Sequence, residues 1–303
     1  MKRKKILALP VACFWSVVGV CLLGIIIGSF CDFDISMALA NQNGIGKYFA
    51  AFSPFLAYML MAAGGACLYV GLKKKGDSFK PLAWALLVFG WFMAVYYSDS
   101  YFGWKIRPMI GYQAGETSAL LSAATWTASA VLYAGVSFAV SRLLDDSDPE
   151  RLIAIGAALL IATIASDAVM QWLKQVGSRP RPKYLLTLKD PASEYRNWWQ
   201  MVPYLADQND NFQSWPSGHM SIVSTLFALP LLTDCMKVKT RLKPRVNLCA
   251  FILVCIFILL CGYNRIHMTN HFLSDVCFGT LNTLLITAGF CKAFTKSLRK
   301  EIS

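Results

Sequence analysis

Three short polar clusters interrupt an otherwise apolar chain, and they carry most of its chemically reactive side chains. Lysine and arginine hold phosphate oxygens, histidine can attack or protonate a substrate, and a carboxylate can orient a histidine. All of these side chains occur together in the clusters, which favours a site that binds and cleaves a phosphate ester. In chain order, the clusters are Lys174-x6-Arg181-Pro182, Pro216-Ser217-Gly218-His219 and Arg265-x5-His271-x3-Asp275.

The second cluster begins an apolar run and is expected to start a helix. Unpaired N–H groups and the positive end of the helix dipole meet at the first turn of a helix, where they attract an anion. Ser217 can add a hydroxyl donor, Gly218 lets a ligand come close to the backbone, and His219 follows within reach of the bound group. An ordinary helix start with an incidental histidine would have the same sequence.

The third cluster pairs a histidine with a carboxylate. His271 and Asp275 are four residues apart, so on a helix they share a face and can form a hydrogen bond. Such a bond fixes the tautomer of the imidazole and leaves its other nitrogen free as a nucleophile, which favours His271 over His219 as the attacking residue. Arg265 supplies a planar fork for phosphate oxygens. The alternative is an interfacial group of charges without a catalytic role.

His267 offers a different interpretation of the same segment. It lies four residues before His271, so His267, His271 and Asp275 can also be read as metal ligands on one helix. The segment is expected to bend before the last helix, and no further ligand set is evident. We therefore predict neither a metal nor another cofactor.

The first cluster follows an apolar run and presents several cations. Lys174 is a compact cation at the predicted end of a helix. Two prolines, Pro180 and Pro182, stiffen the turn that presents Arg179 and Arg181. Basic residues that only reach from a helix end to the membrane surface would look the same.

Asp167 lies inside that apolar run, seven residues before Lys174 and four before Gln171, so the three share a helix face. An ionisable residue at membrane depth is costly and is usually functional or paired. Asp167 either supports Lys174 or has a structural hydrogen-bonding role.

The apolar runs that position these clusters are long enough to cross a membrane. Of the 303 residues, 56% are hydrophobic and 15% are charged, whereas a soluble domain carries about a quarter charged residues. The first run, of about 25 residues, is longer than the apolar h-region of a signal peptide, which has about 7–15 residues, so a retained helix is expected. Because about 20 apolar residues span the hydrocarbon core, we predict an all-α, polytopic membrane helix bundle. It has about eight transmembrane helices, at roughly 6–30, 50–72, 81–101, 117–141, 152–173, 217–236, 246–263 and 275–293.

The basic residues predict how the bundle lies in the membrane. If the N-terminus is cytoplasmic, nineteen of the 29 Lys and Arg residues fall in cytoplasmic segments, as the positive-inside rule requires. The prediction is a multi-pass protein of the cell membrane, typical of a bacterial inner membrane, with cytoplasmic N- and C-termini and all three clusters extracytoplasmic. The net charge of +12 is spread over short loops, which argues against nucleic-acid binding and for contact with anionic headgroups of the lipid bilayer.

One longer segment outside the membrane, 183–215, is rich in aromatic residues, which favour the headgroup layer. It is expected to lie on the membrane surface, either as a lid or lateral wall for a lipid substrate or as a belt that only anchors the loop. Its aromatic residues are Tyr184, Tyr195, Trp198, Trp199, Tyr204, Phe212 and Trp215.

The order and spacing of the clusters resemble the type-2 phosphatidic acid phosphatase (lipid phosphate phosphatase) superfamily, whose motifs are K-x6-RP, PSGH and SR-x5-H-x3-D. The resemblance covers roughly 174–275. Asn264 stands where the family has the serine before the third-motif arginine; it can still donate to a phosphate oxygen, so activity is expected to be tuned rather than lost. The family core has six spans, so residues 1–75 would form two extra N-terminal helices and residues 76–303 the phosphatase core.

The resemblance implies a metal-independent phosphoryl transfer in two steps. His271 would attack phosphorus to give a phosphohistidine, with Asp275 orienting it. His219 would protonate the leaving oxygen and then activate water. The phosphoryl oxygens would be held by Lys174, Arg181, Ser217, the Gly218 amide and Arg265. The substrate would be a membrane lipid such as undecaprenyl pyrophosphate, phosphatidate, diacylglycerol pyrophosphate or phosphatidylglycerol phosphate.

Two other functions would use the same residues. A phosphotransferase would pass the phosphoryl group from histidine to a lipid or glycan instead of to water. A transporter or binding protein for anionic lipids would bind its ligand without turnover. Transporters often contain paired, broken helices in two halves, and the sequence shows no such internal symmetry. The hydrolase is therefore the preferred interpretation.

Overall fold

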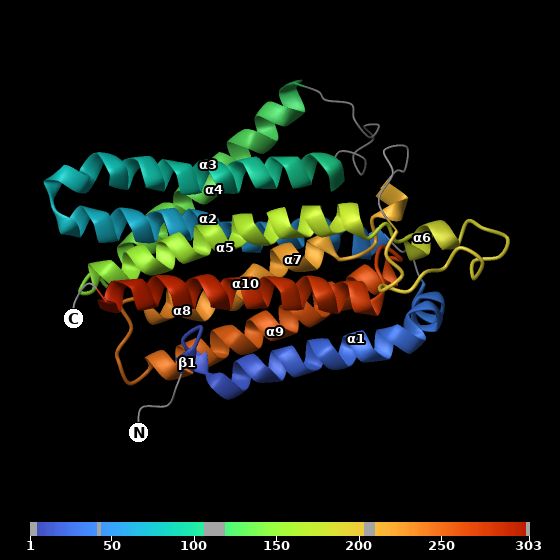
Figure 1. The fold of residues 1–303 in the computed structure, drawn as a ribbon. Helices are drawn as coiled ribbons and strands as arrows, with labels where there is room; N and C mark the ends of the chain where they lie inside the picture. Colours follow the sequence, from blue (N-terminus) through green and yellow to red (C-terminus); the bar gives the residue numbers. More distant parts are fainter. Residues whose placement is uncertain (1–4, 41–43, 106–118, 203–209, 301–303) are drawn as a thin grey trace.

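The computed structural model describes residues 5–40, 44–105, 119–202 and 210–300, which form a helical bundle (Figure 1). The all-α fold agrees with the sequence prediction. Among the described residues, seven helices are long and apolar enough to cross a membrane, which makes this a multi-pass membrane protein. They are α1 (Val11–Leu39), α2 (Gly44–Lys75), α3 (Lys80–Lys105), α4 (Ala119–Leu143), α5 (Pro149–Val176), α9 (Lys243–His267) and α10 (Leu273–Lys300).

Shorter elements precede and connect the long helices. Two short strands, β1 (Lys5–Ile6) and β2 (Leu9–Pro10), pair antiparallel directly before α1. The others are η1 (Asp77–Phe79), α6 (Pro182–Leu185), η3 (Asp210–Phe212), α7 (Gly218–Ser224), η4 (Thr225–Ala228) and α8 (Leu229–Asp234).

The predicted span at 217–236 differs from the prediction. It forms the consecutive short helices α7, η4 and α8, so seven helices of spanning length are found in the described ranges where the sequence predicts about eight. The 3-10 turn of η4 and Pro230 at the start of α8 divide the segment. Because α7 packs against α2, α5, α9 and α10, its irregular backbone is surrounded by protein, where a membrane protein tolerates it.

Close packing of glycines places α2 in the middle of the bundle. A Cβ atom on Gly156 of α5 would lie 2.6 Å from the carbonyl oxygen of Gly64. A Cβ atom on Gly90 of α3 would lie 2.9 Å from the Cα atom of Gly65. Small residues let the backbones of membrane helices approach one another, so α2 joins α3 to α5. The division of the chain into an N-terminal pair of helices, residues 1–75, and a phosphatase core, residues 76–303, stays a prediction.

One end of the bundle carries all three polar clusters (Figure 1). The C-terminal ends of α1, α5 and α9 and the N-terminal ends of α7 and α10 lie at this end, together with α6. The segments that join α2 to α3, α4 to α5 and α8 to α9 lie at the opposite end, with β1 and the C-terminal part of α10. The alternating helix directions thus bring residues that are far apart in the sequence to one place.

The aromatic segment 183–215 packs partly onto α1 and α10. The Nε1 atom of Trp198 donates a hydrogen bond to the hydroxyl of Ser29 on α1 at 2.9 Å. The centroids of the Trp198 ring and of the Phe278 ring on α10 lie 4.7 Å apart. Tyr204, another aromatic residue of this segment, lies outside the described residues. The two expected roles of this segment, a lid for a lipid substrate or a belt that only anchors the loop, both stay predictions.

Candidate active site

A cavity of about 510 Å³ lies where the three clusters meet. Helices α2, α3 and α5 contribute further residues to its walls, several of them with hydroxyl or carboxylate groups. Polar and charged side chains therefore reach a cavity that is built within a bundle of apolar helices. It is lined by Tyr58, Tyr97, Ser100, Tyr101, Asp167, Gln171, Lys174, Arg181, Asp210, Gln213, Gly218, His219, Ile222, Arg265 and His271.

Three buried cations line this cavity. The Nζ atom of Lys174 donates to the carbonyl oxygen of Gln213 at 2.8 Å. Arg181 forms an ion pair with Asp210 at 2.6 Å, and its Nε donates to the Asp210 carbonyl oxygen at 2.8 Å. Arg265 is 3% exposed, and its buried Nε has no hydrogen-bond partner among the described residues. A bound anion can use this unpartnered donor, since a buried N–H without an acceptor is unfavourable.

Two cations at the start of α6, Arg181 and Lys183, are poorly solvated. Burial lowers the pKa of Arg181, and the carboxylate of Asp210 opposes that shift. Burial also lowers the pKa of Lys183, and the positive charge of Arg181 lowers it further. A phosphate anion in the cavity would favour the charged form of both residues. The electrostatics therefore suit a phosphoryl group.

His271 lies among these cations with one ring nitrogen held. Its Nδ1 is 2.7 Å from the carbonyl oxygen of Ser214. Because a carbonyl oxygen only accepts, Nδ1 carries the proton and Nε2 keeps its lone pair. Burial, and then the positive charges of Arg181 and the other two cations, hold the pKa of His271 well below its usual value of 6.5. The ring is therefore neutral near pH 7, with Nε2 available as a nucleophile.

Asp275 does not hydrogen-bond to His271 as the sequence predicts. Its carboxylate accepts from the Ser214 hydroxyl at 2.6 Å and from the Phe272 N–H at 2.9 Å, and it pairs with Arg179 at 2.7 Å. The prediction assumes that His271 and Asp275 share one helix, but α10 begins only after His271. Ser214 instead links the two residues, since its hydroxyl donates to the Asp275 carboxylate and its carbonyl oxygen accepts from the His271 imidazole.

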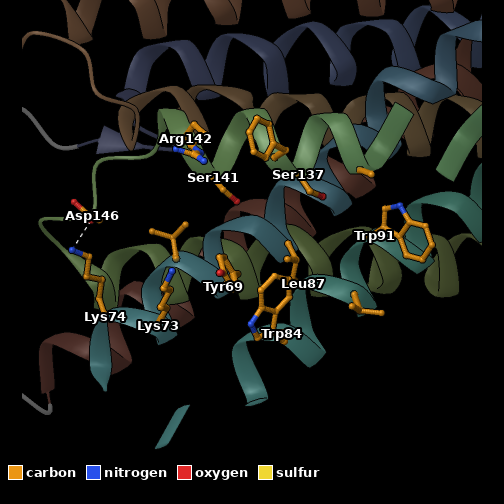
Figure 2. Close-up of a pocket in the computed structure, with 14 residues that line it drawn as sticks. Tyr69, Lys73, Lys74, Trp84, Leu87, Trp91, Ser137, Ser141, Arg142 and Asp146 are labelled. Atoms are coloured by element: carbon orange, nitrogen blue, oxygen red, sulfur yellow. Dashed lines mark ion pairs between the residues drawn. The ribbon is translucent and has the colours of Figure 1, made fainter. Parts of the chain in front are cut away.

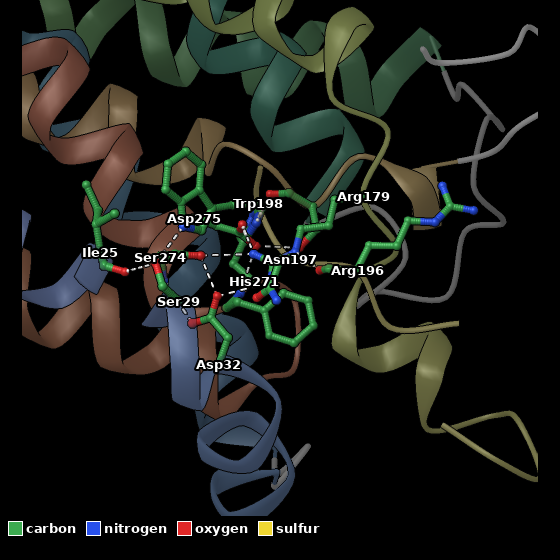
Figure 3. A network of polar contacts seen from close by, with 12 residues as sticks. Ile25, Ser29, Asp32, Arg179, Arg196, Asn197, Trp198, His271, Ser274 and Asp275 are labelled. Atoms are coloured by element: carbon green, nitrogen blue, oxygen red, sulfur yellow. Dashed lines mark hydrogen bonds and ion pairs between the residues drawn. The ribbon is translucent and has the colours of Figure 1, made fainter. Parts of the chain in front are cut away.

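A buried ion-pair network supports this arrangement (Figure 3). Arg179, which is 3% exposed, pairs with Asp275 and, at 3.0 Å, with Asp32 of α1. Asp32 also accepts hydrogen bonds from the backbone N–H of Ser274, at 3.0 Å, and from its hydroxyl. The Arg179 guanidinium lies 4.0 Å from the centroid of the Phe272 ring. Arg179, predicted only as a supporting residue, thus ties α1 and α10 to the turn before α6.

His219 is held by two helices that precede the clusters in the sequence. Its Nε2 is 2.8 Å from the hydroxyl of Ser53 on α2, and its Nδ1 is 2.5 Å from the hydroxyl of Tyr101 on α3. His219 and Tyr101 line the cavity, and Ser53 does not. Sequence reasoning missed both partners, because a Ser or Tyr within an apolar run looks like a packing residue.

Ser217 and Gly218 lie at the start of α7, where the second cluster predicts a helix. Ser217 is the N-cap, and its hydroxyl accepts a hydrogen bond from the Met220 N–H at 3.4 Å. Its side chain is fully buried and does not line the cavity, whereas Gly218 does. Direct contact between the Ser217 hydroxyl and a phosphate stays a prediction.

Asn264 does not line the cavity, contrary to the expectation that it donates to a phosphate oxygen. Its side-chain amide donates to the carbonyl oxygen of Gly46 on α2 at 3.1 Å. Successive residues of a helix point about 100° apart, so the helix that turns Arg265 toward the cavity turns Asn264 toward α2. Asn264 therefore joins α9 to α2 in this structure.

Asp167 lines the cavity, and the side chain of Gln171 donates to it at 3.4 Å. This places a carboxylate beside the predicted phosphate site. A supporting role for Lys174 stays a prediction.

His267 is turned toward α1, where its Nδ1 lies 3.0 Å from the carbonyl oxygen of Leu39. It does not line the cavity. Within the part of the chain that the structure describes, no group of three or more His, Cys, Asp and Glu side chains is placed to hold a metal ion. The alternative metal site of His267, His271 and Asp275 is therefore not formed.

Comparison with known families identifies the part of the chain that carries the clusters. Residues 155–299 match the family model of the PAP2 superfamily. The match agrees with the resemblance that the three clusters show to this superfamily. The PAP2 segment runs from α5 into α10 and contains all three clusters, while Asp32, Ser53 and Tyr101 precede it. Comparison with curated proteins and with solved structures finds no match.

The PAP2 segment and the apolar helices together give the general function. The PAP2 superfamily is generally of phosphatase type, and seven helices of the described chain are suited to cross a membrane. The protein is a membrane phosphatase-like protein.

Proposed function

We propose that this protein is an integral-membrane lipid phosphate or pyrophosphate phosphatase that works through a phosphohistidine. The position of His271 carries the proposal, because its Nε2 keeps a lone pair and the ring lines the same cavity as three cations. Such cations stabilise the negative charge of a phosphoryl group during transfer. The proposed reaction uses only side chains and backbone groups of this chain.

In the first step, Nε2 of His271 attacks phosphorus, and the bond from phosphorus to the leaving oxygen breaks. The electron pair of that bond stays on the leaving oxygen, which takes a proton from His219. Lys174, Arg181 and Arg265 hold the other phosphoryl oxygens. The products of this step are the lipid alcohol, or the lipid monophosphate from a diphosphate, and a phosphohistidine.

In the second step, water attacks the phosphohistidine. The now neutral His219 takes a proton from the water as its oxygen bonds to phosphorus, and the N–P electron pair returns to Nε2 of His271. Inorganic phosphate leaves, and His219 is protonated again for the next cycle. The Ser214 carbonyl holds Nδ1–H in both steps, which keeps the ring oriented and stabilises its positive charge while it is phosphorylated.

The cavity favours a substrate whose tail stays in the membrane. It extends from the cations to Tyr97 of α3 and Asp167 of α5, both within membrane-spanning helices. An amphiphile can therefore place a phosphate headgroup among the cations while its tail remains between lipids. The candidate substrates are undecaprenyl pyrophosphate, phosphatidate, diacylglycerol pyrophosphate and phosphatidylglycerol phosphate.

We also propose that the cavity faces the extracytoplasmic side of a bacterial inner membrane. The segments at the opposite end of the bundle hold most of the basic residues, which favours a cytoplasmic location for that end. Both termini would then be cytoplasmic.

The direct test is phosphate release by the purified protein from a panel of lipid mono- and diphosphates, with EDTA present. Release of inorganic phosphate in EDTA supports the proposed hydrolase. Radiolabel that moves from one lipid to another lipid or glycan would instead show a phosphotransferase. Binding of the lipids without turnover would show a binding protein or transporter and contradict the proposal.

A close contact at Gly279 gives a prediction about the geometry of the site. A Cβ atom on Gly279 of α10 would lie 2.4 Å from the carbonyl oxygen of Ser217, so Gly279→Ala must displace the start of α7. We expect a loss of phosphate release of about 10- to 100-fold, since a shift of about 1 Å in a catalytic group has effects of this size. Gly289→Ala is the matched control on the same helix, where a Cβ atom meets nothing within 4 Å. Equal rates in the two variants would contradict the prediction.

The pKa of His271 gives a prediction about stability and pH. In the folded protein without phosphate, His271 stays neutral well below pH 6.5, whereas the unfolded chain takes up a proton there. The free energy of unfolding should therefore fall as the pH is lowered from 6.5, by up to about 1.4 kcal/mol per pH unit from this residue. His271→Gln removes that contribution, so the wild-type melting temperature should fall more than that of the variant between pH 7 and 5. A difference that is constant with pH would show that His271 titrates normally.

A further inference from the structure

A second cavity, of about 840 Å³, lies near the segments that join α2 to α3 and α4 to α5, at the end of the bundle opposite the phosphate site. It is formed by α2, α3 and α4 and shares no lining residue with the first cavity. Figure 2 shows three basic residues, Lys73, Lys74 and Arg142, toward one side of it and Trp91 at the other. The cavity is therefore charged where the helices end and aromatic where they run into the membrane.

The membrane-spanning part of this cavity is a groove between α3 and α4. Its inner limit is a direct contact of the two helices, where Nε1 of Trp91 donates to the carbonyl oxygen of Ala130 at 2.9 Å. From there toward the end of the bundle the walls are mostly apolar, with the hydroxyls of Ser137 and Ser141 on α4. Trp84 and Phe138 are 56% and 64% exposed. Trp84 and Trp91 are seven residues apart, so the groove is about 10 Å deep along α3. That depth accommodates much of an acyl chain.

The basic residues at the outer part of the groove lie in the last turns of α2 and α4. Lys74 is paired with Asp146 at 2.7 Å. Lys73 and Arg142 lie instead over the rings of Tyr69 and Phe138, and no ion pair involves either of them in the described parts of the chain. The lining thus carries two positive charges that no carboxylate neutralises, at the depth where lipid headgroups lie.

We propose that this groove binds an anionic phospholipid, with its phosphate between Lys73 and Arg142 and an acyl chain along Trp84 and Phe138. Basic pockets between membrane helices are suited to anionic headgroups, and cations on aromatic rings keep their charge available. A zwitterionic lipid would leave the two charges unneutralised, and a soluble anion would leave the apolar groove unfilled. The proposal does not depend on the proposed phosphatase activity.

The test compares phosphatidylglycerol with phosphatidylcholine of the same acyl chains, added to the purified full-length protein in detergent. Bound lipid is counted by native mass spectrometry, and the melting temperature is measured in parallel. The variant is Lys73→Gln/Arg142→Gln. The matched control is Lys239→Gln/Arg241→Gln, which removes two exposed basic residues between α8 and α9 at the same end of the bundle.

Phosphatidylglycerol should bind preferentially to the wild type and the control, and its affinity for the Lys73/Arg142 variant should be at least about tenfold lower. Phosphate release by that variant should equal the wild-type rate, because neither residue lines the phosphate cavity. Equal binding of phosphatidylcholine would overturn the proposal, as would an equal loss in both double variants. If glycerol 3-phosphate alone raised the melting temperature through Lys73 and Arg142, the ligand would be a soluble phosphate and not a lipid.

Discussion

His271→Ala is expected to lower phosphate release by at least about 1000-fold, because the variant has no nucleophile for the first step. The protein should still fold. The substitution removes one hydrogen bond, to the Ser214 carbonyl, and the side chain borders a cavity rather than the middle of the hydrophobic core. The measurement is phosphate release from a lipid monophosphate, with the melting temperature of the same preparation as the control for folding. Wild-type rates in this variant would rule out the proposed nucleophile.

A labelling experiment separates the roles of the two histidines. His219→Ala should still form the phosphohistidine from a substrate with a good leaving group, but should hydrolyse it slowly because it lacks the base of the second step. Phosphate label should therefore accumulate on the protein in His219→Ala and be absent in His271→Ala. Label that depends on His219 instead would reverse the two roles.

Asp32→Ala is expected to have the second largest effect, although Asp32 lies outside the PAP2 segment. The substitution removes one of the two carboxylates that pair with the buried Arg179 and leaves the backbone N–H of Ser274 without its acceptor. Breaking a buried ion pair from one side typically costs about 3–5 kcal/mol. Phosphate release should also fall, by about tenfold or more, since Asp275 and the Ser214 contact to His271 belong to the same network.

Asp34→Ala is the matched control for this prediction. Asp34 is two residues further along α1, is exposed, and makes no hydrogen bond or ion pair in the described structure. Its removal should change neither the melting temperature nor the rate by much, because exposed charges contribute little. Asp32→Asn should lie between the two, since an amide oxygen can still accept from Ser274 but carries no charge. If Asp32→Ala melted and reacted like the wild type, the network would not be needed for the site.

The sequence predicts the parts of the site that depend on local spacing. Apolar runs of spanning length and their alternating directions place the three clusters at one end of the bundle, and the start of α7 at Gly218 follows from the residues around it. Such features depend on residues close together in the chain, so they can be read without knowing the tertiary structure.

The contacts that orient the histidines could not be predicted in this way. The predicted bond between His271 and Asp275 requires a shared helix, and the actual start of α10 after His271 gives that role to the Ser214 carbonyl instead. Ser53 and Tyr101 reach His219 from other helices, so only the packing of α2 and α3 reveals them. A carboxylate at the end of an apolar run, such as Asp32, signals a buried partner without showing which one.

The network around Arg179 has a consequence for how the protein is made. Asp32 enters the membrane with α1, whereas Ser274 and Asp275 enter with α10, so the buried ion pairs can close only after nearly the whole bundle has been inserted. A nascent chain that stops before α10 has Asp32 and Arg179 without several of their partners, and unpaired charges in such a setting are strongly unfavourable. Assembly of the site therefore requires that both the first and the last long helix are in place.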